Sequence, residues 1–180
     1  MRAARRVRHG PGAAVDSLAM IVIVMGVTGA GKTTVGRRLA AELGWAYCDA
    51  DDFHTAGNVC RLSHGVGLTD ADRGPWLSAL RASIDGVLDE GRSAVYGCSA
   101  LRATYRQALA DGRPEVRFVH LHGPEALLAE RLRRRVGHSM DPGLLHSQVR
   151  TLELPAGDLR VSIALPLAAQ IRVIRAALDR

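Results

Sequence analysis

The sequence predicts an α/β protein of three layers, α/β/α, in which helices cover both faces of a mostly parallel, five-stranded sheet. Three observations predict this fold class. From Met20 onward, short apolar runs alternate with longer segments whose apolar residues recur at helical spacing, as in strands joined by crossover helices. A glycine-rich loop follows the first apolar run. The 180 residues are 47% hydrophobic, enough for one continuous core, so we expect residues 20–180 to form a single domain.

The first predicted elements surround the glycine-rich loop. Residues 21–25 are all apolar and predict a buried strand, and residues 26–31 predict the loop itself. Residues 32–43 predict a helix, because their apolar side chains recur every four positions, and Gly44 suits the C-cap of that helix. Residues 45–48 then predict the second strand.

The rest of the chain continues the same alternation. Pro75 predicts the start of a helix that runs to about residue 90, since proline is favoured in the first helical turn. The remaining predicted strands are residues 93–98, 117–121 and 159–164. The remaining predicted helices are residues 101–110, 124–136, 142–153 and 166–178.

Composition disfavours several classes of protein. The three cysteines are far apart and form no CxxC pair, so neither a disulfide framework nor a zinc site is predicted, and a cytoplasmic location fits best. The strongly apolar run at residues 20–25 is too short to span a bilayer, and the arginine-rich start of the chain lacks the apolar core of a secretory signal. We therefore expect no membrane partner.

Residues 1–19 are expected to form a disordered tail. Much of the formal charge of +6 comes from this segment, where four arginines accompany one aspartate. A mitochondrial presequence is the less favoured interpretation of this composition. Because the other basic residues are not interleaved with aromatic side chains that could stack on bases, we expect no nucleic-acid partner.

The loop carries the most specific motif of the chain. The stretch GVTGAGKT fits G-x-x-x-x-G-K-[ST] and lies between an apolar strand and a helix, the context that a phosphate-binding P-loop requires. Its glycines let successive N–H groups turn toward phosphate oxygens at a helix N-terminus. Lys32, the only lysine of the chain, is expected to reach the β- and γ-phosphates, and Thr33 to bind Mg²⁺. The predicted ATP-binding residues are Gly26, Val27, Thr28, Gly29, Ala30, Gly31, Lys32, Thr33 and Thr34.

The acidic residues narrow the class of P-loop protein. A GTPase needs an Asn/Thr-Lys-x-Asp element, which the use of the only lysine at position 32 excludes. Motor and helicase ATPases carry an Asp at the end of a later strand, whereas AVYGCSA and RFVHLHG end without one. The acids follow the second strand instead, in AYCDADD, which is typical of small-molecule kinases with a fold like that of nucleoside monophosphate kinases.

Two polar clusters leave alternatives open. The stretch CDADDFH, residues 48–54, fits a solvated turn, a metal site or the place where an acceptor hydroxyl loses its proton. The arginines of RLRRRVGH, residues 131–138, fit either charges that complement a helix C-terminus or an arginine-rich lid over phosphates. Arg73 is equally an ion-pair partner or an anchor for an anionic acceptor.

Several segments together resemble the gluconate kinase (gluconokinase) family of sugar-acid kinases. They are MGVTGAGKTTVG, DADDFH, GVGLTDADRGPWL, CSALRATYR, FVHLHG, LLAERLRRRVGH and LLHSQVRTLE. The resemblance runs in the same order from about residue 21 to residue 153. It implies transfer of the γ-phosphoryl group of ATP to the 6-hydroxyl of D-gluconate in a cytoplasmic homodimer.

The resemblance also implies roles for individual residues. Asp49 would support Mg²⁺ together with Thr33, and Asp51 would orient or deprotonate the acceptor hydroxyl. Contacts with the sugar acid are implied for His54 and for Arg73, whose guanidinium would pair with the carboxylate. Ser99 and Arg106 are further substrate candidates. Arg135 is the expected transition-state cation, with Arg131 and Arg134 as alternatives, and Lys32 completes the catalytic set.

The chain departs from the family pattern at a few positions. Cys60 and Arg61 stand where a small or polar residue and lysine are usual, and Ser139 replaces a more usual aromatic residue. The stretch RVSIALPL lacks the acidic residues that follow the last strand in the family, so adenine contacts are not assigned there. A P-loop kinase of another small hydroxy acid, such as shikimate, is the alternative function.

Overall fold

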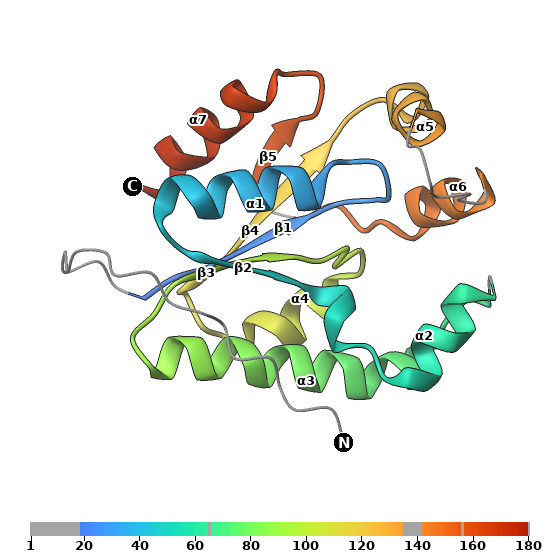
Figure 1. The fold of residues 1–180 in the computed structure, drawn as a ribbon, viewed down its shortest axis with the longest axis horizontal. Helices are drawn as coiled ribbons and strands as arrows, with labels where there is room; N and C mark the ends of the chain where they lie inside the picture. Colours follow the sequence, from blue (N-terminus) through green and yellow to red (C-terminus); the bar gives the residue numbers. More distant parts are fainter. Residues whose placement is uncertain (1–18, 65, 135–141, 156, 180) are drawn as a thin grey trace.

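A parallel sheet of five strands forms the middle layer of the protein (Figure 1). The computed structural model describes residues 19–64, 66–134, 142–155 and 157–179. The strands lie in the order β2-β3-β1-β4-β5, and every pairing among them is parallel. Their bounds are Ile21–Met25 for β1, Ala46–Asp49 for β2, Ala94–Gly97 for β3, Val116–His122 for β4 and Leu159–Ser162 for β5. The predicted three-layer α/β class is confirmed.

Helices cover both faces of this sheet, and their bounds are Lys32–Leu43 for α1, Ala56–Ser63 for α2, Asp70–Asp89 for α3, Ala103–Ala110 for α4, Glu125–Arg133 for α5, Pro142–Thr151 for α6 and Leu167–Leu178 for α7. A short 3-10 helix, η1, spans Ala50–Phe53. In Figure 1, α1 and α7 lie on one face of the sheet, and α3 and α4 lie on the other. Helices α2, α5 and α6 lie toward the carboxyl ends of the strands.

The central strand β1 explains why the first apolar run is continuous. All five of its residues are fully buried. Val22 and Val24 belong to the hydrophobic cluster that contains α1 and α7, whereas Ile21, Ile23 and Met25 pack in the cluster of α3 and α4. A parallel strand that is covered on both faces reads as an unbroken apolar run.

The start of α3 differs from the prediction. The helix begins at Asp70, and Pro75 lies inside it. Thr69 caps the helix: its side chain accepts a hydrogen bond from the Asp72 N–H at 3.2 Å, and the Asp72 carboxylate accepts one from the Thr69 N–H at 2.9 Å. This reciprocal capping box satisfies two backbone donors. It therefore starts the helix before the proline.

The sequence also failed to predict α2 as an element. Thr55 is its N-cap and accepts a hydrogen bond from the Asn58 N–H at 3.2 Å. The helix is only eight residues long and has a single buried residue, Asn58. A helix this short carries too few apolar repeats for its period to stand out in the sequence.

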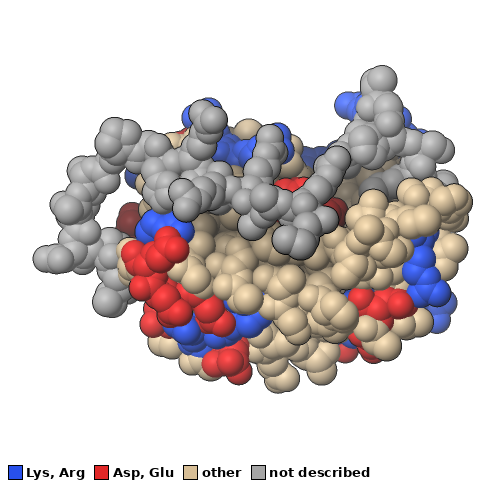
Figure 2. Space-filling view, turned by 60° about the horizontal axis from the view of Figure 1, so that its bottom comes forward, with Lys and Arg blue, Asp and Glu red and all other residues tan. Residues whose placement is uncertain are grey.

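Acidic and basic side chains are mixed on the face that α3 covers. Figure 2 shows blue and red residues side by side around a large uncharged area. Arg81 pairs with Asp85 at 2.7 Å, and Arg113 pairs with the same carboxylate at 3.0 Å. Among the described residues, no helix is long and apolar enough to cross a membrane.

His120, on β4, is a buried histidine on the α4 side of the sheet. Its side chain is 1% exposed, and its Nδ1 atom has no hydrogen-bond partner among the described residues. Burial, and to a smaller extent the positive charges of His122, Arg160 and Arg106, together lower its pKa to about 4. His120 is therefore neutral in the folded protein at neutral pH.

We expect this residue to reduce stability in mild acid. Below pH 6.5 the His120 side chain binds a proton in the unfolded chain, whereas in the folded chain it stays neutral until the pH falls to about 4. The resulting loss of stability is absent above pH 6.5, grows as the pH falls from 6.5 to about 4, and is complete below that pH. Between pH 7.5 and pH 5, His120 should lower the free energy of unfolding by about 2 kcal/mol. Urea unfolding at both pH values measures this.

His120→Leu should lose that share of the pH dependence. His64→Leu is the matched control, because His64 is exposed, and it should keep the pH dependence of the wild type. An equal pH dependence in His120→Leu and the wild type would contradict the prediction.

Candidate functional site

The loop between β1 and α1 has a backbone that only glycine adopts easily. Gly26, Gly29 and Gly31 have φ values of 141°, 78° and 94°. A Cβ atom on Gly26 would lie 2.6 Å from the carbonyl oxygen of Leu121, closer than packed atoms approach. Gly26 therefore lets the start of the loop pack directly against β4.

Lys32 and Thr33 open the first turn of α1. The Lys32 Nζ atom donates a hydrogen bond to the Val27 carbonyl oxygen at 3.2 Å, across the curve of the loop. The first turn of α1 contains no acidic residue. A helix N-terminus of this kind presents unsatisfied N–H groups and partial positive charge, which favour a phosphate group.

Asp49 lies at the carboxyl end of β2 and faces the loop. Its Oδ2 atom accepts hydrogen bonds from the Thr33 hydroxyl at 3.5 Å and from the Tyr47 hydroxyl at 3.2 Å. Its Oδ1 atom accepts one from the Asp51 N–H at 3.2 Å. Tyr47 was not among the predicted site residues. The signal for it was its position two residues before Asp49, which places both side chains on one face of the strand.

Asp51 lies in the η1 turn, with its carboxylate in the cleft and open to solvent. Partial burial by the walls of the cleft raises its pKa above the ordinary value, and the negative charge of Asp49 adds to this. The His54 Nε2 atom lies 4.0 Å from its Oδ1 atom. A carboxylate with a raised pKa is better suited to accept a proton. Asp52, next to it, is exposed and does not line the cleft.

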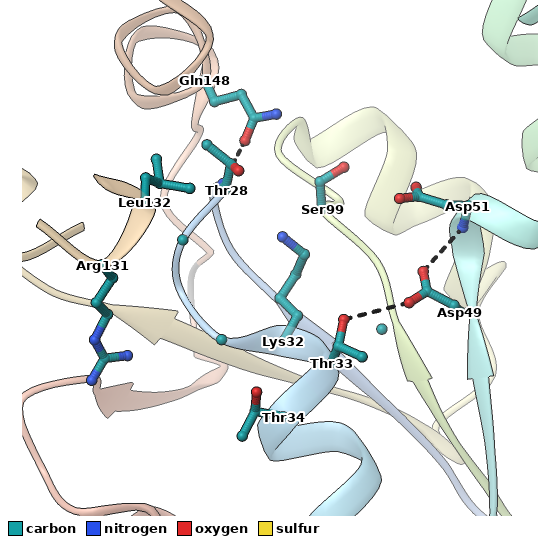
Figure 3. A pocket seen from close by; sticks show the side chains of 13 residues that line it. Thr28, Lys32, Thr33, Thr34, Asp49, Asp51, Ser99, Arg131, Leu132 and Gln148 are labelled. Carbon is teal, nitrogen blue, oxygen red and sulfur yellow. Dashed lines mark hydrogen bonds between the residues drawn. The ribbon is translucent and has the colours of Figure 1, made fainter. Parts of the chain in front are cut away.

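These elements enclose a cavity of about 710 Å³ at the carboxyl edge of the sheet (Figure 3). Figure 3 shows the Lys32 amine pointing into it from below and Asp51 facing it from one side. It is lined by the predicted Thr28, Gly29, Gly31, Lys32, Thr33, Thr34, Asp49, Asp51 and Ser99, by the alternative cation Arg131, and also by Gly97, Leu132 and Gln148. Nine residues of the predicted site and one of its alternatives therefore meet in one place.

A second cavity of about 450 Å³ adjoins the first. The two share Gly31, Thr34 and Arg131. Its other walls come from α1, from the segment between β5 and α7, and from the first turn of α7: Val35, Ala164, Leu165, Pro166, Leu167 and Gln170. The RVSIALPL stretch, to which no contact was assigned from the sequence, thus ends in a wall of a cavity beside the P-loop.

His54 is held beside Asp51 by packing on an aromatic side chain. Its ring stacks on Trp76, with centroids 4.9 Å apart and planes inclined by 15°. The Trp76 indole N–H donates to the Ala50 carbonyl oxygen at 2.7 Å, which fixes the stack. Burial lowers the pKa of His54, although the Asp51 charge opposes this. The buried Nδ1 atom of His54 has no hydrogen-bond partner among the described residues.

Arg73 has both an ion pair and an exposed portion. Its Nη1 atom lies 3.6 Å from Asp70 Oδ1 and donates to the Tyr105 hydroxyl at 3.3 Å. Its side chain is 32% exposed. Arg102 pairs with Asp70 at 2.6 Å on the other side. The ion-pair alternative for Arg73 is thus present, and its contact with a substrate carboxylate stays a prediction.

Arg106 is the predicted substrate residue that lies deepest inside the fold. It is 8% exposed, and its Nη1 atom donates to the carbonyl oxygens of Ala100 and Leu101 at 3.0 and 3.2 Å. These bonds support the loop after β3, where Ala100 has a positive φ of 42°. Ser99 on the same loop lines the cavity. Arg106 therefore orients the loop that carries Ser99, and any substrate contact of its own stays a prediction.

The three candidate arginines of the predicted lid, Arg131, Arg134 and Arg135, differ in where they lie. Arg131 lines both cavities, and its Nη2 atom donates to the Ile163 carbonyl oxygen at 2.6 Å. Arg134 is 78% exposed and pairs with Glu130 at 2.6 Å. Arg135 lies outside the described residues, as do residues 1–18 of the predicted tail.

Gln148, like Gly97 and Leu132, lines the cavity but was not predicted from the sequence. It lies on α6, and its Oε1 atom accepts a hydrogen bond from the Thr28 N–H at 2.7 Å. No local sequence pattern predicts this contact, because the two residues are 120 positions apart and Gln148 belongs to no recognised binding motif. The SQVRTLE stretch contributed only to the family resemblance.

The sequence and the fold of this chain were compared with those of known proteins. A family model described as an AAA domain matches residues 21–154. The gluconokinase of Gluconobacter oxydans is 44% identical over 144 residues, which cover 78% of this chain and 81% of that protein. The crystal structure of a gluconokinase from Sinorhizobium meliloti has 40% identity and a TM-score of 0.81, with 91% of this chain and 93% of that chain covered. A shikimate kinase from Acinetobacter baumannii, with 16% identity, a TM-score of 0.54 and coverage of 89% of this chain and 94% of its own, shares the fold alone.

Proposed function

The chain belongs to the gluconokinase family, and from this we propose that it transfers the γ-phosphoryl group of ATP to the 6-hydroxyl of D-gluconate, giving 6-phospho-D-gluconate. The observation that carries the proposal is the shared cavity, in which the P-loop and the Asp51 carboxylate face one another. A phosphate donor and a proton acceptor on opposite walls suit in-line transfer to a hydroxyl held between them.

The larger cavity is the proposed site of the ATP phosphates. Residues 26–34 would surround the phosphates, with N–H groups at the N-terminus of α1 donating to them, and Lys32 would contact the β- and γ-phosphates. The adjoining cavity extends from Thr34 past Arg131 and has apolar walls at Val35 and Leu167. We place the adenine base there, because a base needs an apolar cleft next to the phosphate site.

The donor set beside the P-loop fits Mg²⁺. Thr33 and Asp49 offer a hydroxyl and a carboxylate within 3.5 Å of each other, and Mg²⁺ prefers such oxygen ligands together with phosphate oxygens and water. When bound, the ion would neutralise charge on the β- and γ-phosphates. Tyr47 holds the Asp49 carboxylate toward Thr33.

The acceptor hydroxyl would lie between Asp51 and the γ-phosphate. Asp51 accepts the proton of the hydroxyl as the oxygen–phosphorus bond forms, and the bond from phosphorus to the β–γ bridging oxygen breaks to release ADP. His54 would contact sugar hydroxyls, and Arg73 would pair with the carboxylate of the acid. Ser99 lines the same cavity. Arg135 is proposed as the transition-state cation, and Arg131 is the described alternative at the cavity wall.

Assembly and location follow the family resemblance. We propose a homodimer in the cytoplasm. Size-exclusion chromatography with light scattering distinguishes a dimer from a monomer of 19.3 kDa.

ADP release by the purified protein tests the function directly. With ATP and Mg²⁺, we expect D-gluconate to give a kcat/KM at least about tenfold above those of shikimate and of the neutral polyol D-glucitol, since glucitol offers Arg73 no carboxylate. Reactions without acceptor give the background of ATP hydrolysis. No ADP release above this background with gluconate, or a preference for shikimate, would contradict the proposal.

A further inference from the structure

Gln148 joins α6 to the phosphate loop across the main cavity. The bond from the Thr28 N–H to its Oε1 atom is 2.7 Å long and links residues 120 positions apart. Both residues line the cavity that contains Lys32 and Asp51. A loop N–H that lies beside the phosphate site is thus satisfied by a side chain from a different helix.

This bond determines which way the amide group faces. The amide is planar, with an acceptor oxygen on one side and an NH₂ donor on the other. Reversing it would place the NH₂ group against the Thr28 N–H, two donors in contact, so the oxygen must face Thr28. The Nε2 atom therefore points away from Thr28, and Figure 3 shows it directed into the cavity on the side of Ser99.

We propose that Gln148 contacts the γ-phosphoryl group of ATP, with Oε1 fixing the Thr28 peptide and Nε2 donating a hydrogen bond to a γ-phosphate oxygen. This inference rests on the proposed function. It deepens that function by assigning a γ-phosphate contact to α6. The space that Nε2 faces lies between the P-loop and the wall that carries Asp51 and Ser99. That is where the phosphoryl group must lie if Lys32 contacts it from below and the acceptor approaches from Asp51.

Gln148→Glu separates this role from a purely structural one. A glutamate keeps the oxygen that accepts from Thr28, but it replaces the NH₂ donor with an anionic oxygen that faces the phosphate. We expect the affinity for a non-hydrolysable ATP analogue to fall about tenfold to a hundredfold, the range for a hydrogen bond to a charged group. The affinity for ADP, which lacks the γ-phosphate, should stay within about threefold of the wild type. Calorimetric titration of each nucleotide with the full chain measures both.

Two further variants complete the experiment. Gln148→Leu removes both polar atoms and should also weaken binding of the ATP analogue more than binding of ADP. Retained ADP binding would show that the site is still folded. Gln107→Glu makes the same chemical change on the exposed face of α4 and should leave both affinities unchanged. The proposal is overturned if Gln148→Glu binds the ATP analogue as tightly as the wild type does, or if its affinities for the analogue and for ADP fall by the same factor. These titrations contain no gluconate, so they stand apart from a failure of the acceptor assignment.

Discussion

Replacing Asp51 with asparagine is expected to lower kcat with gluconate by about 10²- to 10⁴-fold, the usual contribution of a positioned general base. Asparagine keeps the size of the side chain and the turn that holds it, but its amide cannot accept the proton of the hydroxyl. ATP binding should persist, because the P-loop contacts are untouched. Steady-state kinetics and nucleotide titration together measure the split between kcat and affinity.

Asp52→Asn is the matched control, since Asp52 is the neighbouring carboxylate and does not line the cavity. It should keep kcat within about threefold of the wild type, as expected for a residue that contacts neither substrate. Wild-type kcat in Asp51→Asn would refute the role of general base.

The dependence of kcat/KM on pH is a second measurement on the Asp51→Asn and Asp52→Asn variants. Partial desolvation by the walls of the cleft and the charge of Asp49 raise the pKa of Asp51 above the ordinary 3.8. The base must be ionised to act, so kcat/KM should fall as the pH drops through this raised pKa. That acid limb should be present in Asp52→Asn and weakened or absent in Asp51→Asn.

Replacing Lys32 with methionine is expected to lower kcat/KM by about 10³-fold, because a positive charge aimed at the transferring phosphate contributes electrostatic stabilisation of that order. Lys32→Arg should recover little of this loss. The guanidinium is planar and larger than an ammonium, and the tight curve of the loop, where Nζ lies 3.2 Å from the Val27 carbonyl oxygen, suits the compact group.

Arg38→Met controls for the loss of one positive charge from α1. Arg38 is 58% exposed and pairs with Glu42 at 2.7 Å, one turn further along the helix. It should keep kcat/KM within about threefold of the wild type, because an exposed i,i+4 pair contributes only a few tenths of a kcal/mol to stability. Full activity in Lys32→Arg would show that charge alone suffices at position 32.

Local patterns predicted the sheet and the phosphate loop because each depends on residues close together in the chain. The apolar run of β1 and the Gly/Lys/Thr spacing of the loop are complete within residues 21–33. The placement of Asp49 and Asp51 followed from the same order of elements, since parallel strands bring their carboxyl ends to one edge. The start of α3 was wrong because the capping box at Thr69 outweighed the preference of proline for a first turn.

The sequence by itself therefore determined the α/β class, the P-loop and the acids that face it. Only the tertiary structure decided which distant side chains hold the site residues in place. Gln148 accepts a hydrogen bond from the Thr28 N–H, Arg106 donates to the loop that carries Ser99, and Trp76 stacks on His54. The physical reason is that such contacts have no period or spacing in the sequence. They depend on how α3, α4 and α6 pack against the sheet and its loops, and that packing is a property of the whole core.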